Sequence, residues 1–331
     1  MVRQWSIRIG KKLIYMLLLV TAASLLTFLL MKASPVDPLQ ANVGQAALGS
    51  MSQDQVEKLR EYWGVNGSPV RQFLSWASDF IRGDMGTSLL YRQPVSEVLK
   101  VKLMNSLVLM ITAWILSGIL GFALGAVAGM NQGGWADKAV KGYCLLIAGT
   151  PTFWLALVLL LVFGVWLKVL PIGLSVPIGV EAAGVTVWDR IYHAILPAAA
   201  LSITGVANIA LHTREKMIEI MNSDYMMFAR ARGQRGFRLF CQHGFHNVLL
   251  PAVTLHFASI SEIFGGSVLV EQVFSYPGLG QAAVTAGLGS DLPLLMAVAV
   301  TTALIVFGGN MLADILYGVV DPRIRRGGRG K

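Results

Sequence analysis

The chain has 331 residues, of which 55% are hydrophobic and only 14% are charged, and its mean hydropathy is +0.62. Soluble domains carry about 25% charged residues, so this composition indicates a membrane protein rather than a soluble domain. The net charge of +9 does not by itself indicate nucleic-acid binding, because Lys and Arg collect on the cytoplasmic side of membrane proteins. We therefore expect the chain to sit in a lipid bilayer and to have no nucleic-acid partner.

Six apolar stretches are long enough to cross a membrane as helices. A helix rises about 1.5 Å per residue and the hydrocarbon core is about 30 Å thick, so one span needs about 20 residues. The predicted spans cover residues 13–31, 103–130, 142–167, 195–212, 248–270 and 294–317. The sequence therefore predicts an all-α membrane protein with six transmembrane helices.

The basic residues are concentrated in four segments that share one side of a six-span topology. These segments are residues 1–12, the turn between the second and third spans, residues 213–247 and the tail at 319–331. Positively charged segments stay in the cytoplasm, so we expect both termini to be cytoplasmic. A cleaved signal peptide is the alternative for the first span. Its apolar run is long for a signal, and cleavage would leave five spans with basic ends on opposite sides.

The largest predicted external segment covers residues 32–102, between the first span and the core of the protein at 103–318. Ser52 and Gln55 have the spacing of a capping box, which predicts a helix starting at this point. The segment is not of low complexity, and we interpret it as a small folded cap on the external face.

Three glycines repeat at every fourth position of the second span: Gly121, Gly125 and Gly129. Such a repeat makes a flat helix face that another backbone can approach closely. We favour packing within the chain over an interface between subunits.

The fifth span is the most polar of the six. At 100° per residue, His256 and Ser259 share one face, and Glu262 lies apart from them. Ionisable groups at this depth are costly and face protein or water, so the candidates for the translocation path are His256, Ser259, Glu262 and, in the fourth span, Asn208. A packing role for Glu262 is an equal alternative.

No metal site is predicted. His256 and Glu262 lie about 240° apart around one helix, so that helix alone cannot direct both at one ion. Cys144 and Cys241 lack zinc-binding spacing and are interpreted as ordinary thiols. His243 is interpreted as structural.

The segment between the fourth and fifth spans is too polar to cross a membrane. Asn222 or Ser223 can cap a helix that begins near Asp224, and Gly233 can end it. Taken alone, a short basic amphipathic helix could simply lie in the lipid interface.

This segment resembles the cytoplasmic loop of ATP-binding-cassette (ABC) importer permeases of the peptide and nickel branch. The matching positions are Asp224, Tyr225, Ala229, Ala231 and Gly233, followed by His243, Asn247 and Pro251. Residues 83–88, 271–280 and 314–325 resemble further motifs of the same branch. One departure is Met227, which stands where the wider importer pattern often has Glu.

The resemblance implies the type I importer permease fold, with an external insertion after the first helix and a cytoplasmic coupling helix near residues 224–235. The implied ATPase-coupling residues are Asp224, Tyr225, Ala229, Arg230, Ala231, Arg232 and Gly233. It also implies a bacterial inner-membrane location and four kinds of contact: a second homologous permease, two cytoplasmic ATPase subunits, an extracytoplasmic solute-binding protein and lipid.

A transport subunit of this kind is not an enzyme and needs no cofactor of its own, since ATP is bound by the ATPase subunits. The chain has no GxxxxGK[ST] phosphate loop. Di- or oligopeptides are the implied cargo, and nickel or a metal chelate is the alternative. An ion-driven secondary transporter or a membrane-embedded enzyme fits less well, because we find neither repeated halves nor a paired catalytic motif.

Overall fold

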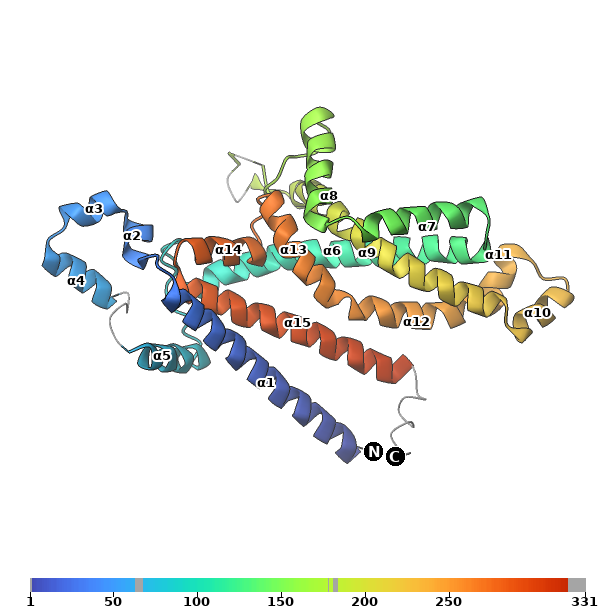
Figure 1. The fold of residues 1–331 in the computed structure, drawn as a ribbon, viewed down its shortest axis with the longest axis horizontal. Helices are drawn as coiled ribbons and strands as arrows, with labels where there is room; N and C mark the ends of the chain where they lie inside the picture. Colours follow the sequence, from blue (N-terminus) through green and yellow to red (C-terminus); the bar gives the residue numbers. More distant parts are fainter. Residues whose placement is uncertain (1, 63–67, 178, 181–183, 321–331) are drawn as a thin grey trace. The chain divides into compact units, whose positions relative to one another are not determined.

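The computed structural model describes residues 2–62, 68–177, 179–180 and 184–320, and these are mostly helical (Figure 1). Residues 321–331, which include most of the predicted basic tail and its Asp-Pro-Arg motif, lie outside the described residues. The helices in chain order are α1 Val2–Ala33, α2 Pro38–Val43, α3 Gln45–Ser50, α4 Gln53–Tyr62, α5 Pro69–Ile81, α6 Val95–Met130, α7 Trp135–Ala148, α8 Thr152–Leu159 continued by a π-helix at Leu160–Trp166, α9 Val187–Met221, α10 Asp224–Ala231, α11 Gly236–Leu239 continued by a π-helix at Phe240–Gly244, α12 Phe245–Ala258, α13 Ile260–Val273, α14 Leu279–Leu288 and α15 Leu292–Val320.

Four helices are long and apolar enough to cross a membrane, and two bent helix pairs raise the number to six if each pair is one span. The four are Gly10–Ala33, Val95–Met130, Val187–Met221 and Leu292–Ile315. The prediction of an all-α membrane protein is therefore confirmed, and each of the six predicted spans falls on one of these helices or pairs.

The third and fifth predicted spans are bent where the sequence analysis expected one continuous helix each. Helix α7 and the pair formed by α8 (Thr152–Leu159) and its π-helix meet at 106°. Pro151 explains this break, because proline lacks an N–H and disfavours helical backbone at the residue before it. The second break, of 48°, lies at Ser259, whose hydroxyl donates a 2.8 Å hydrogen bond to the His256 carbonyl. Such bonds from a serine to the preceding turn often bend helices.

Helix α9 is longer at both ends than the predicted fourth span at 195–212. It begins with a capping box, in which the Thr186 hydroxyl accepts from the Asp189 N–H and the Asp189 side chain accepts from the Thr186 N–H. It continues to Met221, so the first residues of the predicted loop at 213–247 extend the helix. The charged residues in this extension had suggested a loop.

The chain divides into two compact units, the first made of residues 1–106 and 277–307 and the second of residues 107–276 and 308–331. In the first unit, the ring of Phe28 on α1 packs edge-on against Phe73 on α5, with centroids 5.5 Å apart. The predicted capping box at the start of α4 is confirmed, since Ser52 and Gln55 each accept a hydrogen bond from the other's backbone N–H.

A buried aspartate organises the motif at residues 83–88, also within the first unit. The Asp291 carboxylate accepts from the Ser88 hydroxyl and from the Leu90 N–H, and it accepts from the Leu294 N–H in the first turn of α15. This motif is thus fixed to the start of a predicted span.

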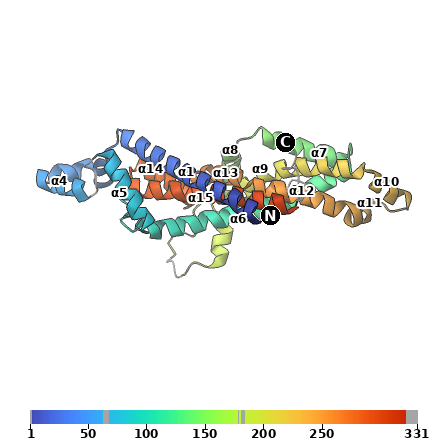
Figure 2. The same cartoon turned by 90° about the horizontal axis from the view of Figure 1, so that it is seen from below.

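In the second unit, α7, α8, α12 and α13 pack along α9 (Figures 1 and 2). The glycine face of α6 also packs on α9. A Cβ at Gly121 would lie 2.7 Å from the Ile209 Cβ, and one at Gly125 would lie 2.5 Å from the Ala210 carbonyl oxygen. Real Cβ atoms do not approach so closely, so only glycine fits, and packing of these glycines within the chain is confirmed.

Candidate coupling segment

The predicted coupling helix is α10, at the end of the second unit beyond the last turn of α9 (Figures 1 and 2). Only Asn222 and Ser223 separate the two helices. Ser223 occupies the cap position of α10, but its hydroxyl donates to the Ile220 carbonyl and makes no capping hydrogen bond to α10. The predicted start near Asp224 is correct, and the proposed capping bond is not formed.

One face of α10 is attached to the rest of the chain. Met226 and Ala229 are buried in an apolar cluster with Met217 of α9, Leu239 and Val248. The resemblance implied that Ala229 is an ATPase-coupling residue. The structure places its side chain against the chain's own core, because the small side chain lets α10 pack closely on these residues.

The opposite face of α10 presents large apolar side chains to the outside. Phe228 is 73% exposed and Met227 is 54% exposed. Tyr225, Arg230 and Ala231 are also exposed. An exposed apolar group next to cations is typical of a protein interaction surface.

His243 and Asn247, two positions of the family motif, hold α10 and the turn after it through hydrogen bonds. The Asn247 side-chain amide donates to the Tyr225 hydroxyl at 3.2 Å and to the His243 carbonyl at 3.1 Å. His243 Nε2 lies 2.7 Å from Gln234 Oε1, just beyond the turn that follows α10. The interpretation of His243 as structural agrees with this contact, and Tyr225 is held at the base of α10 by Asn247.

Gly233 turns the chain after α10. Its φ of +86° lies in the left-handed region that side-chain-bearing residues rarely adopt. The Gln234 N–H returns to the Ala229 carbonyl at 3.2 Å, which closes the end of the helix. Arg232, the residue before the turn, is exposed.

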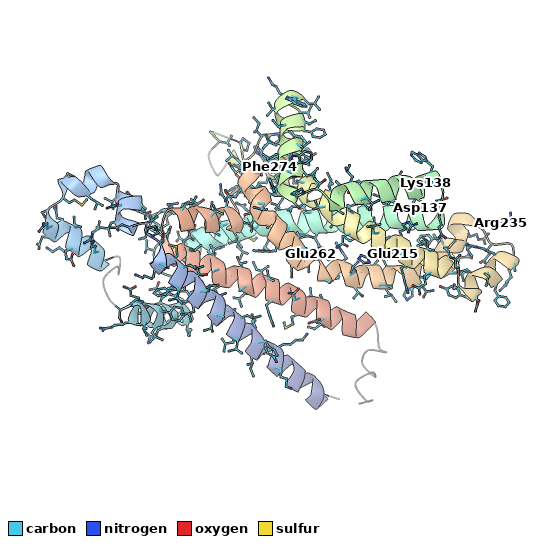
Figure 3. All side chains as sticks on the ribbon, viewed as in Figure 1. Asp137, Lys138, Glu215, Arg235, Glu262 and Phe274 are labelled. Atoms are coloured by element: carbon cyan, nitrogen blue, oxygen red, sulfur yellow. The ribbon has the colours of Figure 1, made fainter. Side chains whose placement is uncertain are left out.

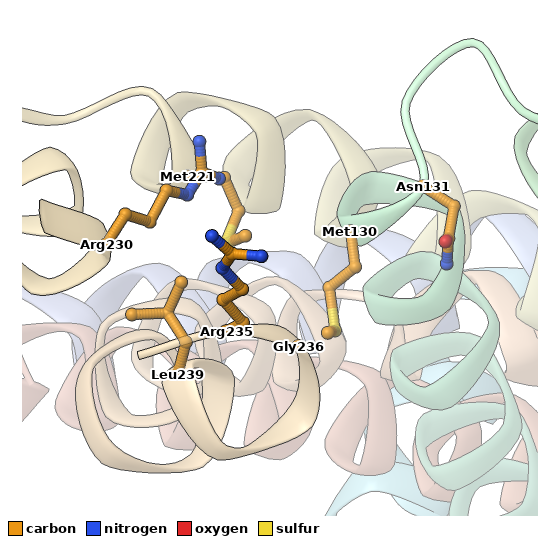
Figure 4. Close-up of a pocket in the computed structure, with 7 residues that line it drawn as sticks. All are labelled: Met130, Asn131, Met221, Arg230, Arg235, Gly236 and Leu239. Carbon is orange, nitrogen blue, oxygen red and sulfur yellow. The ribbon is translucent and has the colours of Figure 1, made fainter. Parts of the chain in front are cut away.

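Two arginines line a cavity of about 480 Å³ beside α10 (Figure 4). The guanidinium groups belong to Arg230 and Arg235, and the apolar part of the wall comes from Met130, Met221 and Leu239. No ion pair to either arginine is found among the described residues. The cavity can therefore accept carboxylate or phosphate oxygens, which arginine binds through two parallel hydrogen bonds.

A buried ion pair fixes the end of α9 that leads to α10. Asp137, labelled in Figure 3, lies in the first turn of α7. It accepts two hydrogen bonds from the Arg214 guanidinium. It also accepts from the Gly133 N–H at 2.8 Å, and its side chain is 1% exposed. The sequence analysis placed Arg214 in the predicted loop at 213–247 and did not pair it with a partner. Asp137, an acidic residue in a turn that was noted for its lysines, was the signal it missed.

The four candidates for the translocation path fall into two groups. His256 and Ser259 are buried, and the His256 ring stacks on Trp114 of α6 with centroids 4.2 Å apart. Glu262 and Asn208 are exposed and joined to each other, since the Asn208 amide donates to Glu262 at 3.4 Å. His256 therefore serves in packing of α12 on α6, and the exposed pair is separate from it.

Part of the motif at residues 271–280 is buried in the second unit. Phe274 and Tyr276 belong to its apolar core, and the Phe274 carbonyl accepts from the Leu174 N–H at 2.9 Å. Burial, strengthened by the nearby Glu271, raises the pKa of Tyr276 to about 12. The phenol is therefore neutral at physiological pH.

Comparison with known proteins gives one consistent result. Residues 121–326 match the family described as binding-protein-dependent transport system inner membrane component. An oligopeptide transport system permease protein, AppB of Bacillus subtilis, is 36% identical over 304 residues, which are 91% of this chain and 93% of that protein. A putative peptide transport system permease protein of Brucella abortus is 34% identical over 91% of this chain and 93% of its own length. A probable peptide ABC transporter permease protein of Sinorhizobium fredii, y4tP, is 31% identical over 97% of this chain and 99% of its own.

Proposed function

Because the chain belongs to the family of binding-protein-dependent transport system inner membrane components and is thus the permease subunit of an ABC importer, we propose that it imports peptides. The names of its relatives support this cargo, since each of the three is called a peptide or oligopeptide permease. Nickel or a metal chelate is the alternative cargo. In the described part of the chain, no group of three or more His, Cys, Asp or Glu residues could hold a metal ion, so no observation favours it.

We propose that α10 is the coupling helix, with its exposed face docked on an ATPase subunit. The observation that carries this proposal is the two-sided character of α10. Met226 and Ala229 attach it to the chain, while Met227 and Phe228 remain exposed. A helix built in this way transmits a partner's movement to α9 as a rigid body.

The arginines of the coupling segment have a defined role in this arrangement. Arg230 and Arg235 line the cavity beside α10, and Arg232 is exposed next to it. We expect them to pair with acidic groups of the ATPase. Asp224, Tyr225, Ala231 and Gly233 shape the helix and its two ends.

Import by this family requires ATPase subunits and a binding protein, and the chain is a membrane-embedded subunit of such a transport system. We propose a complex with a second homologous permease and two ATPase subunits, which bind the ATP. The basic segments support cytoplasmic termini and an external binding-protein surface within residues 32–102.

The test is reconstitution of the permease with its partner permease, ATPases and binding protein in proteoliposomes. We expect ATP-dependent uptake of di- or oligopeptides, and we expect Phe228→Ser to lower this uptake about tenfold or more. If Phe228 is docked on the ATPase as proposed, replacing it by Ser removes apolar contact worth about 2 kcal/mol or more. Uptake and ATP hydrolysis are measured in the same vesicles.

Trp188→Ser is the matched control, because Trp188 is 70% exposed at the opposite end of α9. It should retain peptide uptake. Uptake of nickel chelates without uptake of peptides would reject the proposed cargo. Normal uptake by the Phe228→Ser variant would reject the role of α10.

A further inference from the structure

An exposed carboxylate lies just after the bend in the fifth span. Glu262 is in the first turn of α13, three residues beyond the break at Ser259 (Figure 3). Asn208 of α9 donates its side-chain amide to Glu262 Oε2 at 3.4 Å, and both side chains are exposed. The amide thus orients the carboxylate from a neighbouring helix.

A second polar contact lies on the adjacent residue of α13. The Ser261 hydroxyl donates to Asn310 Oδ1 of α15 at 2.6 Å. Residues of α9, α13 and the second-unit part of α15 therefore bring polar atoms to the first turn of α13. We call Asn208, Ser261, Glu262 and Asn310 the polar group of α13.

This polar group differs from the other polar residues of the span. His256, Ser259 and Ser267 are buried, and the hydroxyls of both serines donate to carbonyls of their own helix. The polar group instead ends at an exposed carboxylate. A carboxylate in a membrane span faces protein or water rather than lipid, because transfer of a charge to hydrocarbon is too costly.

The carboxylate also has unused capacity. A carboxylate offers about four acceptor positions, and the hydrogen bond from the neutral Asn208 amide is long, at 3.4 Å. Among the described residues, no Lys, Arg or His forms an ion pair with Glu262. The group therefore suits a cation that arrives from outside the chain, with hydrogen-bond donors of its own.

We infer that Glu262, oriented by Asn208, binds the ammonium group of the peptide cargo as it passes through the membrane. This inference rests on the proposed function, which supplies a cargo with an amino-terminal ammonium. The ammonium donates to Glu262 Oε1 and Oε2 in a charge-assisted hydrogen bond. Ser261 and Asn310 offer neutral polar atoms beside it.

The test compares two peptides in the reconstituted complex, one with a free amino terminus and the same peptide N-acetylated. Binding-protein affinity for each peptide is measured separately, and uptake is taken at saturation of the binding protein. Glu262→Gln keeps the side-chain shape and removes the charge. We expect it to lower uptake of the free peptide about tenfold, as the loss of a charge-assisted bond implies, and to leave uptake of the acetylated peptide unchanged.

Two further variants make the result decisive. Glu262→Asp keeps the charge and should retain more uptake than Glu262→Gln. Glu219→Gln removes an exposed carboxylate elsewhere on α9, where Glu219 pairs with Lys216, and should affect both peptides alike. Equal uptake of the free peptide by wild type and Glu262→Gln would overturn the inference, and so would an equal loss for both peptides. If the wild type moves no peptide, the proposed function fails first.

Discussion

Asp137 and Arg214 show how a charged pair is accommodated inside the second unit. The Asp137 side chain is 1% exposed and that of Arg214 is 14% exposed, so both charges are largely removed from water. Their two hydrogen bonds and the Gly133 N–H offset part of that desolvation. The pair joins the first turn of α7 to the C-terminal part of α9. The Asp137–Arg214 ion pair thus holds in place the helix that leads to α10.

We predict that Asp137→Ala destabilises the permease by roughly 3–5 kcal/mol, because it leaves Arg214 buried without a counter-charge. The measurement is the thermal midpoint of the purified protein in detergent. Lys141→Ala is the control. Lys141 lies 3.9 Å from Asp137 with its side chain 43% exposed, so its loss should cost at most about 1 kcal/mol. A large loss for Lys141→Ala with none for Asp137→Ala would contradict the prediction.

Helix α9 is the element on which the second unit is built. Helices α7, α8, α12 and α13 pack against it, and two residues separate its end from the start of α10. The glycine face of α6 completes this arrangement, since Gly125 and Gly129 leave room for Thr213 and Met217. Under the proposed coupling role, movement of α10 would be passed to a helix that contacts most of the unit.

We predict that Gly125→Val disrupts the packing of α6 on α9. A Cβ at Gly125 would lie 2.6 Å from the Thr213 Cβ as well as against backbone, so relief requires movement of a helix. Overpacking of this kind costs about 1–3 kcal/mol, and more where backbone must move. Gly142→Val on α7 is the control, because a Cβ there has no neighbour within 4 Å. The yield of folded protein in detergent should fall for the first variant and hold for the second; equal yields would contradict the prediction.

For the whole molecule, the sequence predicted the helices better than their breaks. Runs of about 20 apolar residues are required to cross lipid, so all six stretches could be found by composition. The bend at Ser259 has no Pro or Gly at its position to signal it, and the Ser259 hydroxyl bonds to the preceding turn there. Within the coupling segment, the motif located α10. The burial of Ala229 depends on contacts with residues far along the chain, such as Val248, which the local sequence does not specify.

The orientation of the chain across the membrane gives a prediction for the intact protein. Because basic segments remain in the cytoplasm, residues 32–102 should face outward and the coupling segment should face the cytoplasm. Two exposed positions report on this: the native Cys241, and Arg82 replaced by Cys beyond the end of α5. In intact cells, a membrane-impermeant maleimide should label Arg82→Cys. It should label Cys241 only after permeabilisation.

Cys144 is buried and should stay unlabelled in the folded protein. A Cys241→Ser background isolates the signal of Arg82→Cys, and labelling of Cys241 in sealed cells would contradict cytoplasmic placement of α10.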